Sequence, residues 1–165
     1  MRTLYHLWLT PNCRAVRIAL AEKGLDFELV LEKTWERRVE FLTLDPAGEV
    51  PVLVEADGAV IGGSGAILEY LDDVYKTPSL IGVEPLVRAE VRRLVSWFDD
   101  KFAREVSDLI HGEKFVKRFL TKGEPDSQAV RAGLTNIRTH LDYIAYLIER
   151  RNWLAGEEFS LADIL

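Results

Sequence analysis

The chain has 165 residues, of which 48% are hydrophobic and 29% are charged, as in soluble globular proteins with one core or two small ones. The net charge of -6 disfavours nucleic acid as a partner, and no apolar run approaches the ~18–20 residues that span a bilayer. The single cysteine, Cys13, cannot form an internal disulfide, and no signal peptide precedes the first predicted strand. We therefore expect a cytoplasmic protein without membrane insertion.

The first 31 residues predict a strand, a helix and a second strand. Residues 3–8 alternate between apolar and polar side chains, as strands do. Thr10-Pro11 is a typical helix start, and Gly24 is a typical stop. Apolar Phe27, Leu29 and Leu31 alternate with Glu28 and Glu32, which predicts the second strand. This unit of about 30 residues favours a right-handed crossover between two parallel strands.

A short helix, a hairpin and a third helix are predicted next. Residues 36–44 form the short helix, and residues 52–54 and 59–61 flank Asp57-Gly58, a strong hairpin signal. Ser64 then caps a helix with one apolar side. The expected order is βαβαββα, an α/β domain.

The chain then changes character. Residues 77–84 hold Gly and Pro turn signals and are expected to link a domain of residues 1–76 to an all-α domain of residues 85–165. One long helix starts at Pro85, and a break at residues 123–126 precedes a second helix. Six residues form the expected apolar stripe of that second helix: Val130, Leu134, Ile137, Leu141, Ile144 and Leu147.

A capping box lies at the end of the sequence. Ser160-Leu161-Ala162-Asp163 is typical of a helix start, yet only two residues follow it. We therefore expect the helical C-terminal domain to be incomplete, as in a truncated sequence.

Four stretches of this sequence resemble the glutathione S-transferase superfamily. They are the first helix with its end at residues 13–24, the loop at residues 45–53, the helix start at residues 64–71 and the segment at residues 152–163. The resemblance covers essentially the whole chain. It implies a thioredoxin-like N-terminal domain followed by a helical domain. It also implies that the protein forms a homodimer.

The resemblance also implies a glutathione site. In the family, a cis bond before Pro51 turns the backbone of Val50 toward the cysteinyl part of glutathione, which pairs like one more strand. Ser64 would bind the γ-glutamyl carboxylate, and Gly63 stands where a side chain normally holds the α-amino group. Thr10 stands at the catalytic position, where a hydroxyl would stabilise the thiolate. Glutathione would be a substrate or weak ligand, and no bound cofactor is implied.

Two of these positions depart from the family pattern. Thr10 replaces the usual serine or cysteine, and a plain N-cap role is the alternative reading. Gly63 replaces an acid or amide, and losing that charged hydrogen bond costs roughly 1.5–3 kcal/mol, about tenfold to a hundredfold in affinity. Ser64 could likewise serve only as a helix cap. We therefore predict a degraded glutathione site.

A tryptophan beside two arginines forms a second candidate site. Trp35, Arg37 and Arg38 are residue types enriched at interface hot spots. The alternative is that Trp35 packs on the domain's flank with both arginines in solvent. Together with Gly112-Glu113-Lys114 and residues 152–156, this stretch is similar to a narrower group of glutathione-transferase-like bacterial cell-division proteins, which bind the tubulin homologue FtsZ. In that group the fold is a dimeric scaffold rather than a transferase.

Three functions are consistent with the sequence. The favoured one is a non-catalytic dimeric scaffold that binds FtsZ. The alternative is an active transferase that conjugates glutathione to a small electrophile. The third, a disulfide reductase using Cys13, is disfavoured because a lone cysteine is usually a small, inert core residue. The three histidines lack metal-ligand spacing, so no metal site is expected.

Overall fold

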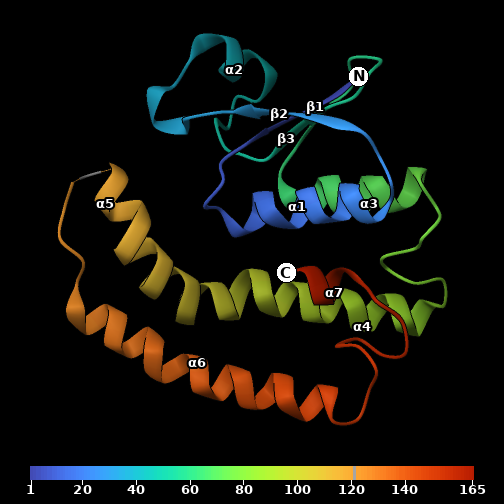
Figure 1. Cartoon of the computed structure of the whole chain (residues 1–165), viewed down its shortest axis with the longest axis vertical. Helices are drawn as coiled ribbons and strands as arrows, with labels where there is room; N and C mark the ends of the chain where they lie inside the picture. The colour runs from blue at the N-terminus through green and yellow to red at the C-terminus, as the bar shows by residue number, and fades with distance from the viewer. Residues whose placement is uncertain (121) are drawn as a thin grey trace. The chain divides into compact units, whose positions relative to one another are not determined.

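The computed structural model describes residues 1–120 and 122–165, which divide into two compact units (Figure 1). Unit 1 comprises Met1–Ile81 together with Ile164–Leu165, and unit 2 comprises Gly82–Asp163. Within the described residues, every helix is too short or too polar to cross a membrane.

Unit 1 is a four-stranded sheet with helices on both faces, and the predicted βαβαββα order is confirmed. The strands lie in the order β2-β1-β3-β4, with β1 and β2 parallel and the others antiparallel to their neighbours. Its elements are β1 (Arg2–His6), α1 (Pro11–Glu22), β2 (Phe27–Leu31), the 3-10 turn η1 (Thr34–Glu36), α2 (Val39–Leu44), β3 (Val52–Val54), β4 (Val60–Gly62) and α3 (Ser64–Val74).

The core of unit 1 lies between the sheet and two helices. Helices α1 and α3 run side by side on one face of the sheet, and α2 lies on the other (Figure 1). Apolar residues spaced three and four apart on α1 and α3 point toward the sheet, as amphipathic helices require. The fully buried side chains include Leu4, Val16, Leu20, Leu53, Ile67 and Leu71.

The predicted alternation in β2 does not match its burial. Leu29 is 39% exposed and Leu31 is 51% exposed, whereas Glu32, directly after the strand, is only 1% exposed. The reason is position, because β2 has a single neighbour and forms one edge of the sheet. Its apolar face is therefore only partly covered.

The start of α3 also differs from the prediction. Gly63, not Ser64, occupies the N-cap position, and Ser64 is the first helical residue. Gly63 has φ +84°, a left-handed conformation that glycine adopts without the steric cost of a Cβ. The chain makes its turn from β4 into α3 at Gly63, so Ser64 enters the helix itself.

Unit 2 consists of helices. Its first long helix starts at Pro85 as predicted, and its second starts after Asp126, whose carboxylate accepts hydrogen bonds from the amides of Gln128 and Ala129 at 2.8 and 3.3 Å. The elements are α4 (Pro85–Ser96), the π-helical η2 (Trp97–Val116), α5 (Lys117–Leu120), α6 (Ser127–Ile148) and α7 (Leu161–Ile164), of which Ile164 belongs to unit 1.

The packed face of α6 agrees with the predicted stripe at Leu147, which is buried, but is rotated away from two of its other members. Leu134 and Leu141 are about half exposed, whereas Gly133 and His140 are buried. A Cβ on Gly133 would lie 2.8 Å from Cγ1 of Ile110, so glycine allows a close approach to η2. The buried His140 has a hydrogen-bond partner, with Nε2 2.9 Å from a carboxylate oxygen of Glu105.

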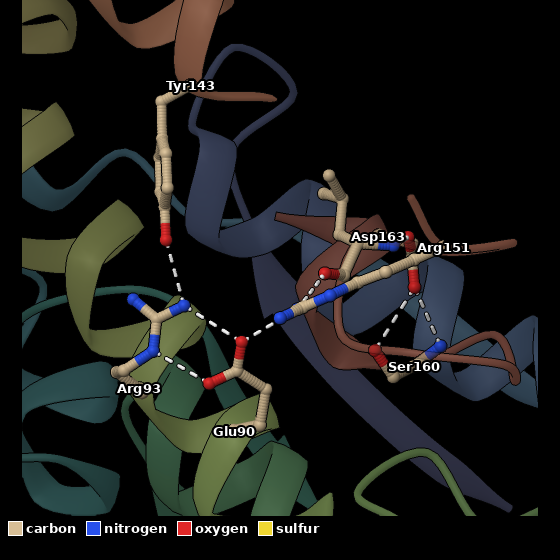
Figure 2. Close-up of polar contacts among 7 residues, drawn as sticks. Glu90, Arg93, Tyr143, Arg151, Ser160 and Asp163 are labelled. Atoms are coloured by element: carbon tan, nitrogen blue, oxygen red, sulfur yellow. Dashed lines mark hydrogen bonds and ion pairs between the residues drawn. The ribbon is translucent and has the colours of Figure 1, made fainter. Parts of the chain in front are cut away.

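The capping box at the end of the chain forms as predicted (Figure 2). The amide and hydroxyl of Ser160 both donate to Oδ2 of Asp163, at 2.9 and 3.1 Å. The other carboxylate oxygen of Asp163, Oδ1, accepts a hydrogen bond from the amide of Leu154 at 2.9 Å. One carboxylate thus fixes both the start of α7 and the loop before it.

A carboxylate on α4 joins three segments of unit 2 (Figure 2). Glu90 accepts from Arg93 at 2.7 and 2.9 Å and from Arg151 at 2.7 Å, while Arg93 also donates to the Tyr143 hydroxyl at 2.8 Å. The hydrogen bonds from Arg93 and then Arg151 lower the pKa of Glu90 to about 2. This network ties α4 to α6 and to the segment after α6.

Candidate functional site

Sheet pairing gathers the candidate residues of unit 1 at one end of the sheet. Tyr5 lies opposite Val52 in an antiparallel pair, so the residues that follow β1 and those that precede β3 share an end. Val52 also lies opposite Gly62, which brings the residues after β4 to that end. Thr10, Val50-Pro51 and Gly63-Ser64 therefore converge, although they are far apart in sequence.

The loop before β3 has the backbone form expected of a peptide-binding segment. The Val50-Pro51 bond is cis, as predicted, and the carbonyl of Pro51 accepts a hydrogen bond from the amide of Gly63 at 3.0 Å. Pro51 is buried, whereas Val50 is partly exposed. The bond to Gly63 holds the proline loop directly against the turn that starts α3.

The N-terminus of α3 offers main-chain donors. Among the described residues, no side chain caps this helix and no acidic residue lies in its first turn. The first amides of a helix lack partners within it, and its dipole favours an anion there. Ser64 adds a partly exposed hydroxyl. This arrangement can receive a carboxylate, but Gly63 offers no side chain for a neighbouring amine.

The hydroxyl of Thr10 is already engaged. Thr10 occupies the N-cap position of α1 without making a capping bond, and its hydroxyl donates to the carbonyl of Leu7 at 3.1 Å. Cys13 is fully buried, and its sulfur accepts from the Leu7 amide at 3.5 Å. Burial raises the pKa of the Cys13 thiol, with Thr10 and the Leu7 amide acting in the opposite direction. Neither residue presents a ready nucleophile.

Sequence reasoning missed a cation close to this end of the sheet. Arg17 lies four residues after Cys13 on α1, and that spacing was the available signal. Its guanidinium is 3.0 Å from Nδ1 of His6 and 4.8 Å from the ring centre of Trp8, which is 59% exposed. Burial and then Arg17 lower the pKa of His6.

The second candidate region follows β2. Trp35 lies in η1 and is 49% exposed, and Val39 at the start of α2 is 75% exposed. Arg37 between them is exposed and has φ +48°, which is uncommon for a residue with a side chain. Trp35 is thus half exposed, and the exposed cation of Arg37 follows two residues later in the chain.

Arg38 has a partner within the chain. It donates from Nε to both carboxylate oxygens of Glu32 at 3.3 and 3.2 Å, and from a terminal nitrogen to one of them at 2.5 Å. These hydrogen bonds raise the pKa of Arg38. Glu32 carried no signal in the sequence, because its partner lies six residues away across an irregular loop.

The two candidate regions share one end of the sheet. The amide of Glu32 donates to the carbonyl of His6 at 3.0 Å, continuing the parallel pairing of β1 and β2. The segments after both strands, which carry Thr10 and Trp35, therefore start next to each other.

Comparison with known proteins agrees with this geometry. The family model "Glutathione S-transferase, N-terminal domain" matches residues 10–74. A crystal structure of a glutathione S-transferase from Rhodospirillum rubrum F11 superposes with a TM-score of 0.97 and 57% identity, covering 99% of this chain and 74% of that one. The chain belongs to the glutathione S-transferase family.

Two further matches are named for localization to FtsZ and not for transferase activity. FtsZ-localized protein A from Caulobacter vibrioides is 46% identical over 98% of this chain and 72% of its own length. The structure titled FzlA from C. crescentus is also 46% identical, with a TM-score of 0.95, covering 99% of this chain and 74% of that one. The family therefore contains both transferases and an FtsZ-localized relative similar to this chain.

Proposed function

We propose that this protein is a non-catalytic, dimeric scaffold of the bacterial cytoplasm that binds FtsZ through the surface around Trp35. The observation that carries this proposal is that Trp35 is half exposed and Arg37, in the same short loop, is also exposed, in a chain similar to an FtsZ-localized protein. Tryptophan and arginine are the side chains that most often dominate binding energy at protein interfaces.

The state of the glutathione site supports a scaffold over a transferase. The Thr10 hydroxyl donates to the Leu7 carbonyl rather than toward a ligand, and Gly63 has no side chain for the γ-glutamyl amine. Cys13 is buried with a raised pKa, which disfavours the disulfide reductase. With both catalytic functions disfavoured, the fold is best suited to present a binding surface to a protein partner.

Co-pelleting with FtsZ polymers tests the proposal. The Trp35→Ala protein should pellet with at least about tenfold lower affinity than the unmodified protein, a typical loss at a hot spot. Trp153→Ala is the matched control, because Trp153 is similarly exposed, at 43%, but lies in unit 2. Equal pelleting of unmodified and Trp35→Ala protein would remove Trp35 from the proposal, and no pelleting of either would reject FtsZ as the partner.

Two substitutions at Arg37 separate its charge from its backbone. Arg37→Gly relieves the left-handed conformation and removes the guanidinium, whereas Arg37→Ala removes the guanidinium and keeps the constraint. If the cation contacts FtsZ, both variants should bind more weakly. The dimer is tested by light scattering of the eluting protein, which should give twice the 18.8 kDa chain mass.

An active transferase is the second candidate, because the cis Val50-Pro51 bond and the uncapped start of α3 are both retained. Calorimetry with millimolar glutathione and a turnover assay with a chlorinated aromatic substrate test it. Saturable binding with turnover would reject the non-catalytic reading. Weak binding without turnover would support a degraded site.

A further inference from the structure

The loop that carries Trp35 is closed at both ends by one ion pair. Glu32 directly follows β2 and Arg38 directly precedes α2, so the five residues between them span the two partners of the pair. Three hydrogen bonds of 2.5–3.3 Å join the two side chains. A guanidinium that meets both oxygens of a carboxylate fixes direction as well as distance.

The two partners differ in accessibility. The Glu32 side chain is 1% exposed and that of Arg38 is 43% exposed. Glu32 therefore cannot touch a protein partner, and its carboxylate needs a cation because an unpaired buried charge is costly. Arg38 is held in place by that requirement.

The backbone between the partners is also ordered. The amide of Glu36 donates to the carbonyl of Lys33 at 2.8 Å, and that of Arg37 to the carbonyl of Thr34 at 3.2 Å, forming one 3-10 turn. So short a turn has little stability of its own. Its position relative to the sheet depends on what holds its two ends.

We infer that Glu32 and Arg38 are positioning residues, whose ion pair holds the turn with Trp35 and Arg37 in the orientation that binds the partner. This inference rests on the proposed function. It assigns direct contact to Trp35, Arg37 and exposed Val39, and it takes Arg38 out of the contact set. The complementary surface on the partner is an apolar pocket beside a carboxylate.

The primary test is Glu32→Gln, which removes the buried charge and nearly conserves side-chain volume. Glu55→Gln is the matched control, because Glu55 is also a buried carboxylate in unit 1, paired to Arg2 at 3.0 Å. We expect Glu32→Gln to lower FtsZ co-pelleting at least about tenfold, and Glu55→Gln to leave it within about twofold. If both variants lose FtsZ co-pelleting equally, the loss reflects general destabilisation of unit 1, and the inference is overturned.

A second readout does not depend on FtsZ. The chain is labelled with 5-fluorotryptophan, and the ¹⁹F resonance of Trp35 is assigned through Trp35→Phe. Glu32→Gln should shift or broaden this resonance and leave that of Trp153 unchanged, whereas Glu55→Gln should alter neither. An unchanged Trp35 signal in folded Glu32→Gln protein overturns the inference even if FtsZ is not the partner.

The double variant Glu32→Gln/Arg38→Gln separates positioning from contact. If the residues act only as a pair, the double variant binds FtsZ about as weakly as either single variant, because the second change removes nothing further. If Arg38 touches FtsZ itself, the double variant should bind FtsZ more weakly than either single variant, because the two fold-losses in affinity multiply. The assignment of Arg38 to positioning would then be wrong. Failure of the unmodified protein to pellet with FtsZ would instead reject the proposed function and leave the ¹⁹F result to decide the role of the pair.

Discussion

Lys23 donates to Asp72 at 2.9 Å in the interior of unit 1, and the two side chains are 0% and 5% exposed. The same ammonium donates to the carbonyls of Tyr75 and Pro78, both at 2.7 Å, and the amide of Leu80 donates to Asp72 at 2.6 Å. This pair joins the end of α1, the end of α3 and the segment that follows.

Replacing Lys23 with Met should therefore destabilise the protein strongly. Asp72 would keep a buried charge without its cation, and two carbonyls would lose their donor, for an expected loss of about 3–5 kcal/mol in unfolding free energy. Urea denaturation measures the loss. Lys76→Met serves as the control, since its side chain is 73% exposed beside Asp73 and should change stability by less than about 0.5 kcal/mol. A small effect at Lys23 would mean that the pair contributes little.

The degraded glutathione site can be tested by restoring one group. Gly63→Glu returns the missing carboxylate at a position where a Cβ would meet no atom within 4 Å. Because φ is +84°, any L residue there costs about 1–2 kcal/mol, so Gly63→Ala is the proper reference. Calorimetry should show glutathione binding at least about tenfold tighter to Gly63→Glu than to Gly63→Ala. Identical affinities would show that this position does not face the ligand.

Acid stability should depend on Glu90. Its folded pKa of about 2 lies below the ordinary 4.5, so its ionisation stabilises the fold fully above about pH 4.5, and this contribution is lost as the pH falls toward 2. Glu90→Gln should lower stability by about 2 kcal/mol at neutral pH, and the gap should narrow below pH 4.5. Urea midpoints measured across this range test the sign. Glu149→Gln, at a 69% exposed side chain, is the control and should change stability at neutral pH by less than about 0.5 kcal/mol.

Cys13 should be chemically inert in the folded protein. Its side chain is fully buried and burial raises the pKa of its thiol, so little thiolate is available at neutral pH. A chromogenic disulfide reagent should modify it about a hundredfold more slowly in buffer than in concentrated urea. Similar rates under the two conditions would contradict the burial of Cys13 and revive the reductase reading.

The sequence predicted the order of elements well because each boundary carried a local signal. The Asp57-Gly58 turn, the prolines that start α1 and α4, and the capping box at Ser160 all act through residues near in sequence. The errors arose where distant neighbours decide. The rotation of α6 depends on η2 approaching Gly133, and the exposure of Leu31 depends on β2 being an edge strand.

In the candidate sites, too, features with a signal in the sequence were predicted, and features that depend on distant neighbours were missed. The resemblance to the family was sufficient to predict the cis bond at Val50-Pro51, and strand register then places Gly63 beside it. Glu32 was not predictable, because its role depends on a loop that returns Arg38 to the end of the strand. Arg17 was missed because its partners, His6 at the end of β1 and Trp8 in the turn after it, lie outside α1.

The ion pair of Glu32 and Arg38 also lies at the end of an edge strand, where sheets of two molecules could pair. Strand β2 is an edge with exposed Leu29 and Leu31, and such an edge invites pairing with a strand of another molecule. The exposed member of the pair, Arg38, places a charge where this edge strand ends, and charged side chains disfavour pairing between sheet edges. We therefore expect loss of the Arg38 charge to reduce solubility as well as partner binding.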